Sequence, residues 1–126
     1  MRLRPLTLLL PLVLLTAGCS EAREAASTVS DCAGLASDVA RSGLSGVPTQ
    51  AEAEQAVQRL DERVETLESP AVRDAATALR DRLRDLQEAA SSADPAAAAQ
   101  AADEARAAAR RTAEACGLPA SQFLGG

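Results

Sequence analysis

Two apolar stripes in this sequence have the spacing of packed helices. Over residues 50–68 and 70–91, apolar residues recur at alternating intervals of four and three, as in helices that bury one face. The stripes are Ala53, Val57, Leu60, Val64 and Leu67, followed by Val72, Ala76, Leu79, Leu83 and Leu86. No strand pattern occurs along the sequence. The sequence therefore predicts an all-α fold.

Capping signals indicate where four helices begin and end. Thr49 and Glu52 have the spacing of a capping box, and Ser69-Pro70 and Asp94-Pro95 each offer an N-cap followed by proline at the first helical position. Cys116-Gly117-Leu118-Pro119 is typical of a helix end. We predict helices over 28–42, 50–68, 70–91 and 95–116, with a Gly-rich loop from Ser42 to Pro48.

The two leucine-rich helices are predicted to form an antiparallel hairpin. If they continued as one helix, Asp74 and Asp81 would enter the apolar seam, so the chain should reverse near Glu68-Ser69. That reversal places residues beside the seam in three facing pairs: Glu68 with Arg73, Asp61 with Arg80, and Glu54 with Gln87. Exposed ion pairs contribute about 0–1 kcal/mol each, so these pairs select the register more than they supply stability.

The helix predicted over 95–116 carries small residues where the others carry leucine. Its stripe is Ala98, Ala102, Ala105, Ala109, Thr112 and Cys116. Alanine has a high helix propensity but buries little area, so we expect this helix to dock weakly. The chain has no Trp or Tyr and one Phe, so most burial must come from Leu, Val and Ala. We therefore predict a small antiparallel four-helix bundle, rich in alanine, with a thin core.

The first eighteen residues have the pattern of a secretory signal. Arg2 and Arg4 precede an apolar run from Leu6 to Leu15, which is shorter than the about 20 residues of a membrane-spanning helix. The following Thr16-Ala17-Gly18-Cys19 resembles the lipobox of bacterial lipoproteins, with Thr16 at a position where that family prefers leucine. The resemblance implies that the Cys19 thiol is diacylated and becomes the new N-terminus. The alternative is an ordinary secreted protein with a cysteine near its cleavage site.

The lipobox resemblance implies a place in the cell. Two or more acyl chains anchor a protein stably, so the mature chain would stay at the cell membrane, on its extracytoplasmic face. All thirteen basic residues are arginine. Alanine is also abundant, and together these biases indicate a high-GC genome such as that of an actinobacterium. We assign 1–18 to the signal peptide, 19–27 to the lipidated N-terminus and tether, 28–118 to the bundle and 119–126 to a tail; residues 20–27 could also extend the first helix.

With Cys19 assigned to lipid, Cys32 and Cys116 remain as an even pair in an oxidising compartment. Each belongs to an apolar stripe, and the stripe of the first helix is Ala25, Val29, Cys32, Ala36 and Val39. In an up-down-up-down bundle the start of the first helix and the end of the fourth lie at the same end. We therefore predict a structural disulfide between Cys32 and Cys116. A redox-active pair is the alternative.

Residues that could carry chemistry are few. The chain has no His, which removes the ordinary general base at neutral pH and the imidazole metal ligand, and it has no Gly-rich phosphate loop. Two weaker candidates are an acidic face that could hold a cation and an arginine pair that could grip an anionic polymer. They are Asp61, Glu65 and Glu68, and Arg80 with Arg84, between which Asp81 and Asp85 are interleaved. We interpret both as solvated surface, and we predict no catalytic residue, no metal and no cofactor.

The formal net charge of −5 becomes more negative once Arg2 and Arg4 are removed, which argues against nucleic acid as a partner. We expect a membrane-anchored, non-catalytic interaction or structural module that contacts an envelope protein or wall component. The alternative is a lipid-anchored binder of a small or apolar ligand. In the tail, Phe123 and Leu124 could fold back on the bundle or form a docking peptide.

Overall fold

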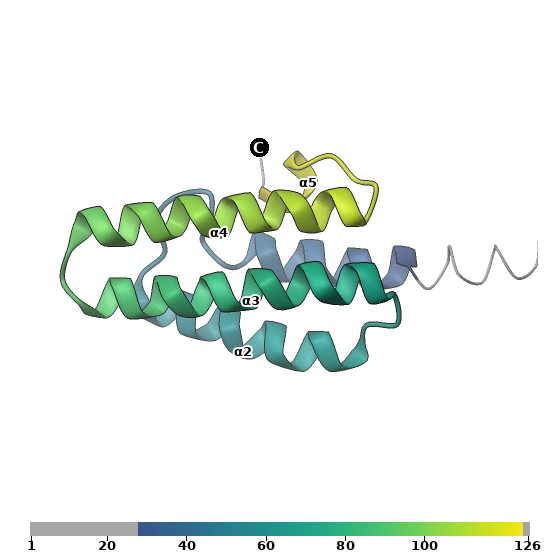
Figure 1. The fold of residues 1–126 in the computed structure, drawn as a ribbon, viewed down its shortest axis with the longest axis horizontal. Helices are drawn as coiled ribbons and strands as arrows, with labels where there is room; N and C mark the ends of the chain where they lie inside the picture. Colours follow the sequence, from purple (N-terminus) through teal and green to yellow (C-terminus); the bar gives the residue numbers. More distant parts are fainter. Residues whose placement is uncertain (1–27, 125–126) are drawn as a thin grey trace, which may run out of the picture.

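The computed structural model describes residues 28–124, and this part of the chain is all-α, as predicted (Figure 1). Its four long helices are the helix that includes residues 28–40, hereafter the 28–40 helix, α2 (Gln50–Thr66), α3 (Pro70–Ser91) and α4 (Pro95–Ala115). A short fifth helix, α5 (Ser121–Leu124), follows α4. The predicted signal peptide, Cys19 and the tether lie outside the described residues.

Successive helices run in opposite directions, so the bundle has two distinct ends (Figure 1). The turn between α2 and α3, residues 67–69, lies at the same end as the C-terminus of α4; we call this the disulfide end. The loop 41–49 and the turn between α3 and α4, residues 92–94, lie at the opposite end. This is the up-down-up-down arrangement that the helical hairpin and the capping signals predicted.

The predicted caps are present and explain the helix boundaries. Thr49 accepts from the Glu52 amide at 3.2 Å while the Glu52 carboxylate accepts from the Thr49 amide at 3.1 Å. Asp94 accepts from the amides of Ala96 and Ala97 at 3.0 and 3.3 Å. The observed helices end one or two residues earlier than predicted at residues 40, 66 and 115, because the last turns are occupied by capping residues.

At the end of α4 the chain reverses through a Schellman motif. Gly117 adopts a φ of +69°, the left-handed region that favours glycine. The amide of Leu118 donates to the Ala113 carbonyl at 2.9 Å and that of Gly117 donates to the Glu114 carbonyl at 3.0 Å. This reversal directs α5 back along α4 (Figure 1). Phe123 is fully buried in the core, so the fold-back expectation for the tail is confirmed and the bundle extends to Leu124.

The core follows the predicted stripes of the hairpin closely. All five stripe residues of α3 are buried, and three leucines are completely inaccessible: Leu79, Leu83 and Leu86. On α2 the stripe is also buried, except that Val64 is only partly covered. The α2–α3 hairpin thus supplies most of the large apolar side chains, as its spacing indicated.

The stripe predicted for the first helix is wrong at Val29, which is 67% exposed. The buried face instead uses Cys32, Leu35 and Val39, with Leu35 completely inaccessible. The reason is where this helix meets its neighbours. Cys32 lies opposite Cys116, the residue that follows the last turn of α4, so Val29, one turn earlier, lies beyond the end of α4. Ala25 lies outside the described residues.

Candidate functional site

A disulfide joins Cys32 and Cys116, as predicted, with the two Cα atoms 5.8 Å apart. It connects the 28–40 helix to the end of α4 and closes a segment of 84 residue steps. Cys32 is 2% exposed, while Cys116 is half-buried at the edge of the core. The bond therefore ties the first and last long helices together at the disulfide end.

An ion pair that the sequence analysis missed joins the 28–40 helix to α2. Arg63 Nε donates to Asp38 Oδ2 at 2.8 Å and Nη2 donates to Oδ1 at 3.4 Å. The Asp38 side chain is only 8% exposed. The hydrogen bond to Asp38 raises the pKa of Arg63 above its ordinary value, although burial acts in the opposite direction. The pair fixes how α2 lies against the first helix.

Gly34 makes room for this ion pair. A methyl group at Gly34 would overlap the guanidinium of Arg63, which lies across the 28–40 helix at this point. Gly34 is the one sequence signal that could have revealed the pair, because an isolated glycine within a helical pattern often marks a close approach. No spacing rule connects Asp38 to Arg63, since 25 residues separate them.

Two further polar contacts hold the connecting segments in place. Asp31 accepts from the backbone amides of Glu68 and Ser69 at 3.0 and 3.3 Å, which satisfies donors of the α2–α3 turn. At the opposite end of the bundle, Arg106 of α4 donates to the carbonyls of Leu44 and Gly46, in the loop 41–49, at 3.0 and 2.7 Å. The loop 41–49 is therefore anchored to the alanine-rich helix.

Asp61 and Arg80, which were predicted to face each other across the hairpin, form an ion pair with Arg80 Nη1 3.4 Å from Asp61 Oδ1. Arg84 also reaches Asp61, with Nη2 3.1 and 3.3 Å from the two carboxylate oxygens. The carboxylate of Asp61 therefore contacts two guanidinium groups, those of Arg80 and Arg84, across the α2–α3 hairpin. These contacts pair the two charged groups with each other, in keeping with the interpretation of both as surface residues rather than as a binding site.

The other residues that were predicted to form facing pairs across the hairpin make different contacts or are exposed. Arg73 of α3 donates to the Leu67 carbonyl of the α2–α3 turn. The Glu68 amide donates to Asp31, and its side chain is exposed together with that of Glu65. Gln87 is half-buried in a groove between α2 and α3, while Glu54 is exposed on α2. The direct charge contact between the two helices thus centres on Asp61.

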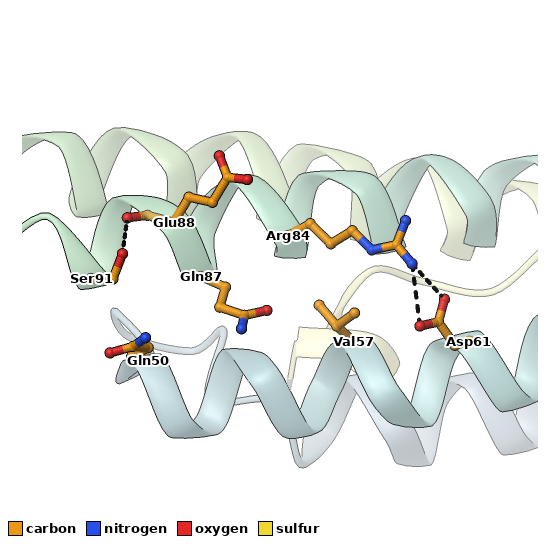
Figure 2. Close-up of a pocket in the computed structure, with 7 residues that line it drawn as sticks. All are labelled: Gln50, Val57, Asp61, Arg84, Gln87, Glu88 and Ser91. Atoms are coloured by element: carbon orange, nitrogen blue, oxygen red, sulfur yellow. Dashed lines mark hydrogen bonds and ion pairs between the residues drawn. The ribbon is translucent and has the colours of Figure 1, made fainter.

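The groove between α2 and α3, which we call the α2–α3 groove, has a volume of about 330 Å³. Figure 2 shows Gln87 directed from α3 toward α2 and the Arg84–Asp61 contact at one end, with Gln50 and Ser91 toward the other end. The Ser91 hydroxyl donates to the Glu88 carbonyl at 2.7 Å. The groove therefore offers amide, carboxylate and guanidinium groups for hydrogen bonding, with Val57 between them.

A second groove runs between the 28–40 helix and α2, and we call it the arginine groove. Its volume is about 470 Å³. It is lined by Asp38, Arg41, Arg59, Glu62, Arg63 and Thr66. Three cationic side chains and two carboxylates therefore surround one hollow. Arg41, Arg59 and Arg63 belong to no motif or spacing pattern of the sequence, so local signals did not predict this groove.

Within residues 28–124, no three His, Cys, Asp or Glu side chains gather in a way that could hold a metal ion. None of the helices in this range is long and apolar enough to cross a membrane. Comparison of the chain with protein-family models, curated proteins and solved structures gives no match.

Proposed function

We propose that this chain is a lipid-anchored protein of the bacterial cell envelope, and that its helical domain acts by binding rather than by catalysis. The observation that carries the proposal is the pairing of the cysteines. Cys32 and Cys116 are joined in the domain, which leaves Cys19 as the third cysteine, within the segment that resembles a lipobox. A disulfide of this kind is expected in an extracytoplasmic compartment.

The binding role is supported by the surface of the domain. Both grooves are lined mainly by charged and amide side chains, while most of the large apolar side chains are packed into the core. Such grooves suit recognition of polar groups on an envelope protein or wall component. The chain also has no His to serve as a general base at neutral pH.

The anchor is tested by expressing Cys19→Ser and following the protein in membrane and soluble fractions. We expect the variant to leave the membrane fraction or to accumulate as an unprocessed precursor. The matched control is the double variant Cys32→Ser/Cys116→Ser, which lacks the disulfide but keeps the lipid attachment residue. A Cys19→Ser protein that is processed and anchored like the wild type would contradict the proposal.

The binding role is tested in cells by site-specific photo-crosslinking. Probes at Gln58 and Ala99, which are exposed on α2 and α4, sample two sides of the bundle, and the same cells without illumination are the control. We expect a discrete crosslinked species from an exposed position after illumination and none without it. Products from neither exposed position, with the protein anchored normally, would count against an interaction module.

A further inference from the structure

Half of the ten arginines in residues 28–124 have a carboxylate partner. Five of them form ion pairs within the chain: Arg63, Arg80, Arg82, Arg84 and Arg106. Arg41 and Arg59, which both line the arginine groove, make no such pair within residues 28–124. In a protein whose formal net charge is −5, two cationic groups without carboxylate partners at one hollow stand out.

Arg59 is poorly satisfied in particular. Its Nη2 donates to Gln55 Oε1 at 3.4 Å, near the limit for a hydrogen bond. Its Nη1 is shielded from solvent and has no hydrogen-bond acceptor. Covering a charged group without pairing it costs free energy, so an anion beside this guanidinium would be stabilised.

The other charges of the groove leave a positive excess. Asp38 is already bound to Arg63, so its charge is matched within the chain. The remaining groups are Arg41 on the exposed turn after the 28–40 helix, Arg59 on α2, and the exposed carboxylate of Glu62. Two cations therefore face one anion across a hollow of about 470 Å³, a volume within the range of small-molecule sites.

We propose that the arginine groove binds a small oxyanion, a carboxylate or a phosphate group, which is held by the guanidinium groups of Arg41 and Arg59. Guanidinium matches both anions because its N–H groups can form two parallel hydrogen bonds to a pair of oxygens. Glu62 opposes this binding electrostatically and limits its affinity. The site does not depend on the lipid anchor, because it lies wholly within the disulfide-bonded domain.

The test is a titration of the full, oxidised chain in a non-ionic, phosphate-free detergent, at constant ionic strength. Inorganic phosphate and succinate are the two probes, and calorimetry measures the binding. We expect saturable binding of at least one probe, and the tighter of the two identifies the chemical source of the oxyanion. Arg59→Gln and Arg41→Gln should each weaken binding at least about tenfold, because each removes a charge-assisted hydrogen bond to the oxyanion.

Two more variants separate a site from general charge attraction. Glu62→Gln should strengthen binding several-fold, whereas Arg110→Gln, at an exposed position on α4, should leave it unchanged. Arg59→Lys, which keeps the charge but loses the paired N–H groups, should weaken binding less than Arg59→Gln does. If Arg59→Gln does not fold, the exposed positions Arg41 and Glu62 decide the outcome. The absence of saturable binding by either probe, or an equal loss in Arg110→Gln, would overturn the proposal.

Discussion

Helices α3 and α4 are neighbours of similar length, yet they are buried in different ways. α3 buries five residues, three of which are leucines. α4 buries eight, of which seven are alanines and one is Thr112. Three buried residues of α4 lie outside its predicted stripe: Ala101, Ala108 and Ala113. The leucine helix therefore contributes a few large side chains, whereas the alanine helix contributes many small ones over a wider face.

Small side chains therefore change how a helix packs, because alanine lets the helix approach its neighbours on more than one side. The area that each alanine buries is small, so α4 relies on contact over its whole length and on the bond at Cys116. We therefore expect α3 to be sensitive to the loss of volume and α4 to the gain of volume or the loss of its covalent tie.

The largest effect is expected from removing that tie. The double variant Cys32→Ser/Cys116→Ser should lose about 4–5 kcal/mol of unfolding free energy on the chain-entropy model, with real values often lower. Denaturant unfolding measures the loss, and hydrogen exchange should increase more along α4 than along α3. A midpoint that is indifferent to reductant in the wild-type protein would contradict this role of the disulfide.

On α3, we expect Leu83→Ala to lower the unfolding free energy by about 2–5 kcal/mol, because Leu83 is completely inaccessible and its removal leaves a cavity. Asp74→Ala, at an exposed position of the same helix, is the matched control and should change stability by less than about 0.5 kcal/mol. Thermal or denaturant unfolding gives both values. Equal effects at the two positions would mean that α3 is not the main source of large buried side chains.

On α4, enlarging a buried residue should be unfavourable. Ala105→Leu places a larger side chain at a completely inaccessible position, and we expect a cost of about 1–3 kcal/mol from overpacking. Ala99→Leu makes the same change at an exposed position, where the effect should stay within about 0.5 kcal/mol. If Ala105→Leu instead stabilised the protein, α4 would be docked loosely, as its composition alone suggested.

The smallest effect concerns the charges that set the register. Reversing Asp61 and Arg80 singly should destabilise the hairpin and reversing both should restore it, with a coupling of a few tenths to about 1 kcal/mol. Because Arg84 shares Asp61, the cycle should be repeated with Arg84→Gln, where the Asp61–Arg80 coupling should increase. Zero coupling in both backgrounds would remove the direct contact as a determinant of register.

Local signals predicted the parts of the fold that depend on neighbouring residues. The caps at Thr49 and Asp94, the stripes of α2 and α3, and the α2–α3 turn follow from spacing alone, and the disulfide follows from topology once the hairpin is known. The exposed position of Val29 could not be predicted, because it depends on where α4 ends in space.

Local sequence patterns also could not predict the α2–α3 groove or the arginine groove. The Asp38–Arg63 pair joins positions 25 residues apart, and Arg41 and Arg59 meet at one hollow only after the 28–40 helix packs on α2. Gly34 indicates that another group lies close to this helix, but a single glycine does not predict that the group is the Arg63 side chain. Long-range polar contacts of this kind arise from the packing of whole helices.

In our proposal Cys19 carries the lipid anchor, while Cys32 and Cys116 form the structural disulfide. Mass spectrometry of the protein, purified from its own membrane under non-reducing conditions, tests both roles in one sample. We expect a chain that begins at Cys19 and carries acyl groups there, together with a peptide in which Cys32 is linked to Cys116. A chain with Cys19 in a disulfide, or with free thiols at Cys32 and Cys116, would contradict this assignment.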